Sequence, residues 1–210
     1  MSETSASTPA PAPPGIADPP APPGIADPAP LGLAGFAMTT FILSFLNANI
    51  IKESAGGNVV LGLALFYGGT AQLLAGMWEF KRGNTFGATA FASFGAFWLS
   101  FWAIERFAVR GSDAHQTIGL FLFSWFIFTG YMTVAALRTN LAVLAVFVLL
   151  TITFLFLAIG AWQNTVPGPA SMTKVGGYFG IATAIAAWYA SFAGVVNETH
   201  RKQLLPTWPR

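Results

Sequence analysis

The chain has 210 residues, of which 54% are hydrophobic and only 9% are charged, and its formal net charge is +2. Soluble domains carry about 25% charged residues, so these charges are too few to cover a water-exposed surface. The Lys and Arg residues are scattered, which excludes the basic patch that nucleic-acid binding requires. No Cys is present to form a disulfide or a thiolate metal site.

The chain opens with a proline-rich tail at residues 1–30, which hold ten of the 14 prolines. A nine-residue segment that begins at Pro13 recurs at Pro22. Proline lacks an N–H donor and favours extended backbone before it, so we predict a disordered or polyproline-II tail. We favour a plain linker over a ligand for a proline-recognition domain.

Six blocks of about 20 mostly apolar residues follow the tail, and each is long enough to cross a hydrocarbon core about 30 Å thick as a helix. We therefore predict an all-α membrane domain at 31–198 and a short cytoplasmic tail at 199–210. The predicted spans are 31–51, 57–78, 86–107, 117–137, 141–162 and 175–196. Lys and Arg are in excess on the side of the termini, six against four, which favours cytoplasmic termini in a multi-pass protein of the plasma (inner) membrane.

Polar and small residues form lines along the first three spans. The lines are Phe36, Thr40, Ser44 and Asn47; Gly69, Gln72, Gly76 and Glu79; and Thr89, Ser93, Ala96 and Ser100. Their spacing of three or four places each line on one helix face. Such a line either borders a wet path or lets helices pack closely. The amides and the carboxylate favour a path, because such groups are costly within a membrane and tend to be functional.

The sixth span carries a different line, made only of small residues at Gly177, Gly180, Ala184, Ala187 and Ser191. This pattern is typical of close helix packing. The partner could be another helix of this chain or another subunit.

The chemistry of an enzyme or a redox centre is missing from the spans. The two histidines, His115 and His200, fall in a predicted loop and in the tail, so no His-based metal site, haem ligand or Ser–His pair is expected in the membrane. We predict neither cofactor nor metal, no enzymatic activity, and a conduit for a small solute.

Several motifs resemble those of the acetate uptake transporter family, whose best-known bacterial member is the succinate–acetate permease. The segment from Asp27 to Phe36, DPAPLGLAGF, runs into Met38-Thr39-Thr40 and is similar to the family's NPAPLGLxGF…TT signature. The likeness continues in FYGG at 66–69, KRGNTFG at 81–87, SFG at 93–95 and LAIG at 157–160. The resemblance implies a six-helix protomer in a homo-hexamer, with a pathway for acetate and related short carboxylates, including succinate, in each protomer.

The resemblance also implies that Phe36, Phe94 and Leu150 close the pathway with an apolar constriction. Phe36 heads the polar line of the first span, as a ring that faces a path would. Phe94 lies about 100° from the line that contains Ser93 and Ser100, so that line is expected to serve packing or a subunit interface instead.

Other residues of the matching motifs are candidates for the substrate and for a proton. Thr39, Thr40, Tyr67 and Gln72 are candidate donors to a carboxylate. Glu79 is either a proton acceptor near one mouth or an ion-pair partner of Lys81 or Arg82. The family's first Asn is Asp27 in this chain, and an ionised Asp27 would repel an anion unless it were turned away.

Three functional hypotheses remain open from the sequence. The first is transport of acetate and related carboxylates, as an anion channel or as a proton-coupled permease. The second is a channel for another small solute such as ammonium or formate. The third is a membrane sensor that keeps the fold without transporting anything.

Overall fold

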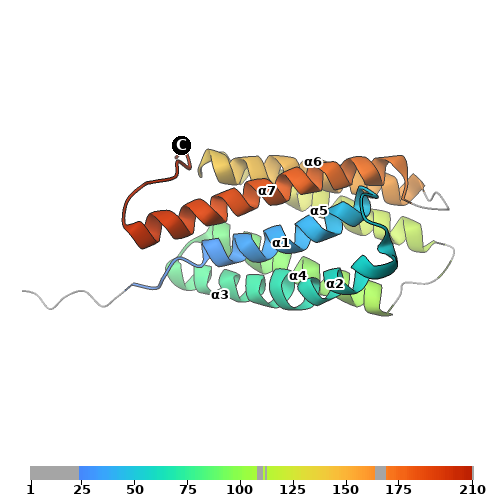
Figure 1. Ribbon diagram of the computed structural model, residues 1–210, viewed down its shortest axis with the longest axis horizontal. Helices are drawn as coiled ribbons and strands as arrows, with labels where there is room; N and C mark the ends of the chain where they lie inside the picture. Colours follow the sequence, from blue (N-terminus) through green and yellow to red (C-terminus); the bar gives the residue numbers. More distant parts are fainter. Residues whose placement is uncertain (1–23, 108–110, 112, 164–168, 210) are drawn as a thin grey trace, which may run out of the picture.

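The computed structural model describes residues 24–107, 111, 113–163 and 169–209, without the side chains of 53–56. The predicted disorder of the tail therefore falls largely outside the described residues. The described part is built from helices that run roughly along one axis (Figure 1). They are α1 (Ala29–Asn47), α2 (Glu53–Leu65), the π-helix η1 (Phe66–Ala71), α3 (Gln72–Arg82), α4 (Thr85–Phe107), α5 (Ala114–Ala136), α6 (Leu141–Gln163) and α7 (Ser171–His200).

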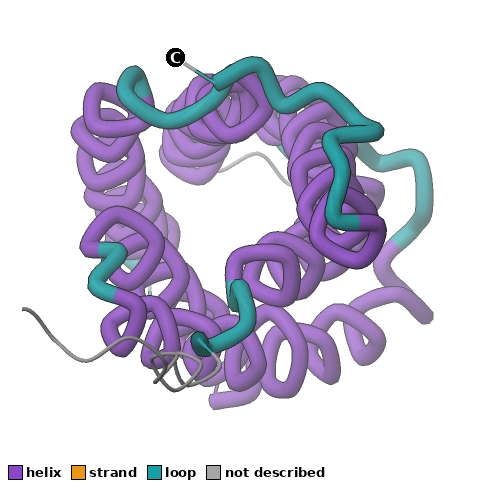
Figure 2. Tube along the Cα trace, turned by 90° about the vertical axis from the view of Figure 1, so that its left-hand side faces the viewer, coloured by secondary structure: helices purple, strands orange, loops and turns teal. Residues whose placement is uncertain are grey.

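The prediction of six membrane spans is confirmed. Six helical stretches in the described part are long and apolar enough to cross a membrane, with α2, η1 and α3 joined into one. Figure 2 looks along the helices and shows them arranged as a ring. The protein is therefore an all-α, multi-pass membrane protein.

The ends of the spans differ from the prediction by a few residues, for local reasons. The second span continues past residue 78 to Arg82, where Gly83 adopts φ 76° and ends the helix. Lys81 and Arg82 suit this last turn, because positive charge interacts favourably with a helix C-terminus. The first span begins at Ala29, since Pro30 is tolerated in a first helical turn.

The small-residue line of the last span packs against α1 of the same chain, which settles the choice of partner. A Cβ atom at Gly177 would overlap the backbone of Ala48, and one at Gly180 would overlap the side chain of Ser44. Near the other end of this contact, the Ser191 hydroxyl donates to the Pro30 carbonyl oxygen at 2.7 Å. The line on α4 behaves differently, because Ala96 and Ser100 are exposed.

The C-terminal tail folds back on the bundle instead of leaving it. Figure 1 shows it turning from the end of α7 toward the start of α6. The side chain of Asn197 accepts hydrogen bonds from the N–H groups of Leu204 and Leu205 and donates to the Leu205 carbonyl. The Trp208 carbonyl in turn accepts from the Leu141 N–H at 3.0 Å. The tail thus satisfies a backbone donor at the N-terminus of α6.

Candidate functional site

The three side chains expected to form a constriction lie together in the core of the bundle. Phe36, Phe94 and Leu150 are buried, and the rings of Phe36 and Phe94 have their centroids 5.7 Å apart. All three line one small cavity of about 20 Å³. The other residues that line it are Leu33, Gln72, Ala90, Phe91, Val146 and Phe147.

Phe94 is held in place by aromatic neighbours on two other helices. Its ring contacts Phe128 of α5 edge-on at 5.4 Å and lies 6.1 Å from Phe147 and 6.4 Å from Phe154 of α6. Because aromatic pairs at these separations are attractive, these contacts stabilise the ring in the position that narrows the cavity. The small cavity is therefore walled by firmly packed, mostly apolar side chains.

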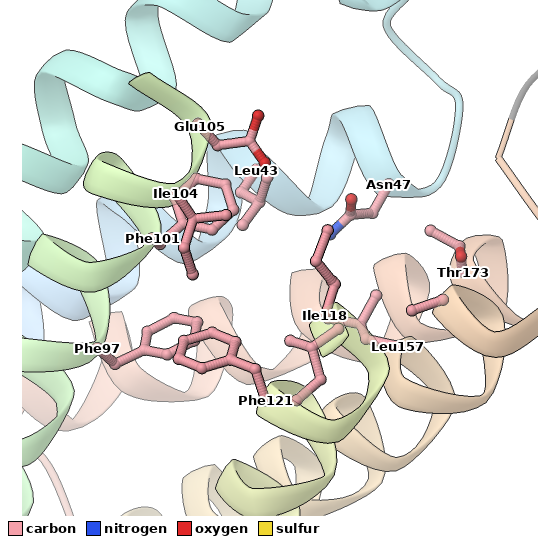
Figure 3. Close-up of a pocket in the computed structure, with 12 residues that line it drawn as sticks. Leu43, Asn47, Phe97, Phe101, Ile104, Glu105, Ile118, Phe121, Leu157 and Thr173 are labelled. Atoms are coloured by element: carbon pink, nitrogen blue, oxygen red, sulfur yellow. The ribbon is translucent and has the colours of Figure 1, made fainter. Parts of the chain in front are cut away.

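A larger cavity, of about 210 Å³, lies between the C-terminal parts of α1, α4 and α6 and the N-terminal parts of α5 and α7 (Figure 3). We call it the vestibule. The stacked rings of Phe97 and Phe121, 5.7 Å apart, form part of its wall. Asn47, Glu105 and Thr173 bring polar groups to an otherwise apolar lining.

The constriction and the vestibule follow one another along three helices. On each of these helices, a residue of the small cavity is followed seven positions later by a residue of the vestibule. The pairs are Phe36 and Leu43 on α1, Phe94 and Phe101 on α4, and Leu150 and Leu157 on α6. Seven residues advance a helix by two turns, or about 10 Å. As the first, third and fifth spans, these helices run in the same direction, so the two cavities lie in series along the bundle axis.

The four candidate donors do not lie together. Gln72 lines the constriction cavity, and Thr40 is buried on the same face of α1 as Phe36. The Thr39 hydroxyl donates to the Gly35 carbonyl at 2.8 Å, so it is already engaged by its own helix. Tyr67 lines a groove on the outside of the bundle, between α1 and α7.

Glu79 is fully buried and has a partner that the sequence did not suggest. Its Oε2 atom accepts a hydrogen bond from Asn84 Nδ2 at 2.9 Å. The Oδ1 atom of Asn84 accepts from the N–H of Gly87 at 3.1 Å, in the first turn of α4. Through Asn84, Glu79 therefore links the end of α3 to the start of α4. Within the part of the chain that the structure describes, neither Lys81 nor Arg82 forms a salt bridge with Glu79.

Asp27 is turned to the end of α3. Its Oδ1 atom accepts from Arg82 Nη1 in an ion pair and from the Ala29 N–H at 3.0 Å. The carboxylate thus stabilises the first turn of α1, where negative charge is favourable. The pair also neutralises Arg82.

Sequence reasoning missed most of the constriction wall. Leu33, Phe91 and Phe147 lie within apolar runs, and nothing in such a run distinguishes a residue that faces a pathway from one that faces lipid. The seven-residue spacing from Phe36, Phe94 and Leu150 does lead to Leu43, Phe101 and Leu157 in the vestibule, and this signal was available in the sequence.

The sequence profile of the GPR1/FUN34/yaaH family matches residues 10–209 of the chain. The chain belongs to this family. The family resemblance inferred from the motifs is therefore confirmed.

Three relatives and one solved structure describe what the chain is similar to. Acetate permease A of Emericella nidulans is 41% identical over 85% of this chain and 64% of its own length. Ammonia transport outward protein 2 of Saccharomyces cerevisiae is 42% identical over 88% and 66%. The succinate-acetate/proton symporter SatP of Escherichia coli is 37% identical over 85% and 93%. The structure of the bacterial acetate channel SatP superposes with a TM-score of 0.79 at 36% identity, over 88% of this chain and 99% of that one.

The chain spans about two thirds of the length of the two fungal relatives. It spans nearly all of the bacterial symporter and of the solved acetate channel.

Proposed function

We propose that this chain carries acetate and related short carboxylates, including succinate, across the membrane through its own six-helix bundle. The names of the fungal permease, the bacterial symporter and the solved acetate channel support this substrate class. The observation that carries the proposal is the ring of Phe36, Phe94 and Leu150, placed in series with a vestibule wide enough for a small acid.

The small size of the constriction cavity requires a solute to lose its hydration water before it passes. The constriction cavity of about 20 Å³ accommodates about one water molecule, so a carboxylate cannot bring its hydration shell through it. Apolar constrictions also gate by dewetting. A small acid therefore leaves its water in the vestibule and slides between aromatic rings, which move aside to let it pass.

Uptake of labelled acetate into proteoliposomes tests the proposal. We would compare two external pH values, with and without an imposed proton gradient. Uptake that follows the gradient supports proton coupling or passage of the neutral acid, and it would make Glu79 the first candidate for a proton site. Uptake that follows the membrane potential alone supports an anion channel. Absence of acetate flux under every condition would overturn the proposal.

A second candidate function is conduction of ammonia or of another small solute such as formate. The relative named as an ammonia transport outward protein favours it. Competition separates the two candidates, because excess ammonium would suppress acetate uptake only if both solutes shared the constriction. A sensor without transport would bind acetate and show no flux.

The assembly and the location are also proposals. A homo-hexamer in the plasma membrane, with both termini in the cytoplasm and no enzymatic activity, suits a transporter of this family. The exposed Ala96 and Ser100 on α4 support a subunit interface, because small residues allow close approach of helices. Native mass spectrometry of the protein in lipid nanodiscs tests the stoichiometry, and a monomer alone would contradict it.

A further inference from the structure

Gln72 is distinct within the constriction, because it is the one polar residue among the nine that line the described cavity. Its side chain is 1% exposed, and its Oε1 atom has no hydrogen-bond partner among the described residues. A buried polar atom of this kind is costly to leave unsatisfied. A water molecule would need two to four polar partners to be held there, and the cavity wall supplies one polar residue.

The π-helix η1 brings Gln72 onto the buried face of its span. In a continuous α-helix each residue turns by about 100°, so Gln72 would lie about 120° from the direction of Val60, twelve residues earlier. A π turn holds one residue more than an α turn, since its hydrogen bonds join i to i+5. That extra residue brings Gln72 back to within about 20° of Val60. Both side chains are indeed buried, at 1% and 2% exposure.

Close contacts hold η1 in this form. A Cβ atom at Gly68 would lie 2.5 Å from the Thr39 hydroxyl, and one at Gly35 would lie 2.7 Å from the Tyr67 carbonyl oxygen. The Thr70 hydroxyl donates to the Leu65 carbonyl, five residues earlier, at 2.7 Å. Gly35 on α1 and Gly68 on η1 thus allow the two helices to approach closely. The Thr70 hydrogen bond further stabilises the wider π turn.

We propose that Gln72, positioned by η1, selects the protonated form of the acid in the constriction. This assignment rests on the proposed function. A neutral carboxylic acid presents one O–H donor and one carbonyl acceptor side by side, and a primary amide presents the complementary pair. The acid can therefore donate to Gln72 Oε1 and accept from Nε2 at once.

A carboxylate anion fits this site less well. It presents acceptors only, so one of its oxygens would face Oε1 without a proton between them. No cation lines the described cavity to offset the charge. The proton stays on the acid while it is bound to Gln72, and the surrounding rings of Phe36, Phe91 and Phe94 keep water away from the pair.

Acetamide provides the test, because it is uncharged at every working pH and also carries a donor and an acceptor on one carbon. Acetate uptake into proteoliposomes would be measured with and without acetamide for the wild type, Gln72→Leu and Gln116→Leu. Gln116 is exposed at the start of α5 and serves as the matched control. We expect acetamide to inhibit the wild type and the control, and Gln72→Leu to lose about tenfold or more in acetate rate and to become insensitive to acetamide.

The role of η1 is tested in the same assay by Thr70→Val, which removes the hydrogen bond to Leu65 on an exposed position. If η1 acts through Gln72, Thr70→Val lowers acetate uptake in the wild type but has little further effect in Gln72→Leu. Equal effects in both backgrounds would overturn the positioning role.

The outcomes separate the two levels of the proposal. Wild-type uptake that is unaffected by acetamide and unchanged in Gln72→Leu overturns the assignment of Gln72 and leaves acetate transport standing. Absence of uptake by the wild type overturns the proposed function, and the assignment falls with it. Circular dichroism of Gln72→Leu checks that a loss of rate does not come from misfolding.

Discussion

Asp27 and Arg82 neutralise each other at the end of the bundle where α1 begins and α3 ends. Their side chains are 38% and 36% exposed, so solvent screens the pair. Exposed ion pairs contribute about 0–1 kcal/mol. The hydrogen bond from Ala29 to the same carboxylate oxygen is local, and an amide oxygen at position 27 could accept it equally well.

We therefore expect Asp27→Asn to keep the helix start while exposing the charge of Arg82 to incoming anions. Acetate uptake should stay the same or rise up to about fivefold, the equivalent of 1 kcal/mol, and a rise should shrink at high ionic strength. Initial rates at low and high salt measure this. A severe loss of uptake at both salt concentrations would mean that Asp27 has a role of its own in transport.

Gly87 is a residue whose size is limited by the buried carboxylate of Glu79. A Cβ atom there would lie 2.6 Å from Asn84 Nδ2 and 2.7 Å from Glu79 Cδ, so Gly87→Ala must displace one or both of these hydrogen-bonded side chains. Overpacking of this kind costs about 1–3 kcal/mol. We expect a lower melting temperature in detergent for Gly87→Ala, with Gly62→Ala as the control because no atom lies within 4 Å of a Cβ at that position. Equal melting temperatures would show that the turn between α3 and α4 tolerates the displacement.

At the level of elements, the spans could be predicted because hydrocarbon thickness fixes their length. That Gln72 and Glu79 share one face also follows from their spacing of seven positions within one short segment. η1 could not be predicted in this way, since a π turn adds one residue without any residue type that requires it. The fold of the C-terminal tail depends on the long-range contacts of Asn197, which no local pattern reveals.

The C-terminal tail is bonded to the start of α6 through Trp208, and Asn197 of α7 holds the tail at Leu204 and Leu205. Asn197→Ala removes three hydrogen bonds to the backbone of Leu204 and Leu205. We expect the amide of Leu141, which bonds to the Trp208 carbonyl, to exchange its hydrogen faster in this variant. Hydrogen exchange read by mass spectrometry measures this, with the amides at the centre of α6 as the internal reference. Unchanged exchange at Leu141 would show that the tail stays in place without Asn197.

For the whole molecule, the sequence motifs predict three residues that line one cavity, but they predict little of the wall around them. The family resemblance predicts that Phe36, Phe94 and Leu150 lie together, and they do line one cavity. Thr39 and Tyr67 are predicted as donors to the carboxylate, but Thr39 is engaged by its own helix and Tyr67 lies in an outer groove. Residues of one motif are neighbours along the chain, whereas the residues that line a cavity come from one face each of several helices. A motif therefore does not show which of its residues face the cavity.

The central claim is that solutes pass between Phe36, Phe94 and Leu150 of one chain, and the size limit for transported acids measures it most directly. Proteoliposomes with the wild type, Phe36→Ala or Phe192→Ala would be tested with acetate, butyrate and benzoate. Phe192 is 57% exposed on α7 and serves as the matched control. We expect Phe36→Ala to admit butyrate and benzoate and to raise the acetate rate, while Phe192→Ala retains the wild-type limit. Identical rates and an identical size limit in Phe36→Ala and the wild type would contradict the account, because the removed ring would then not border the route of the solute.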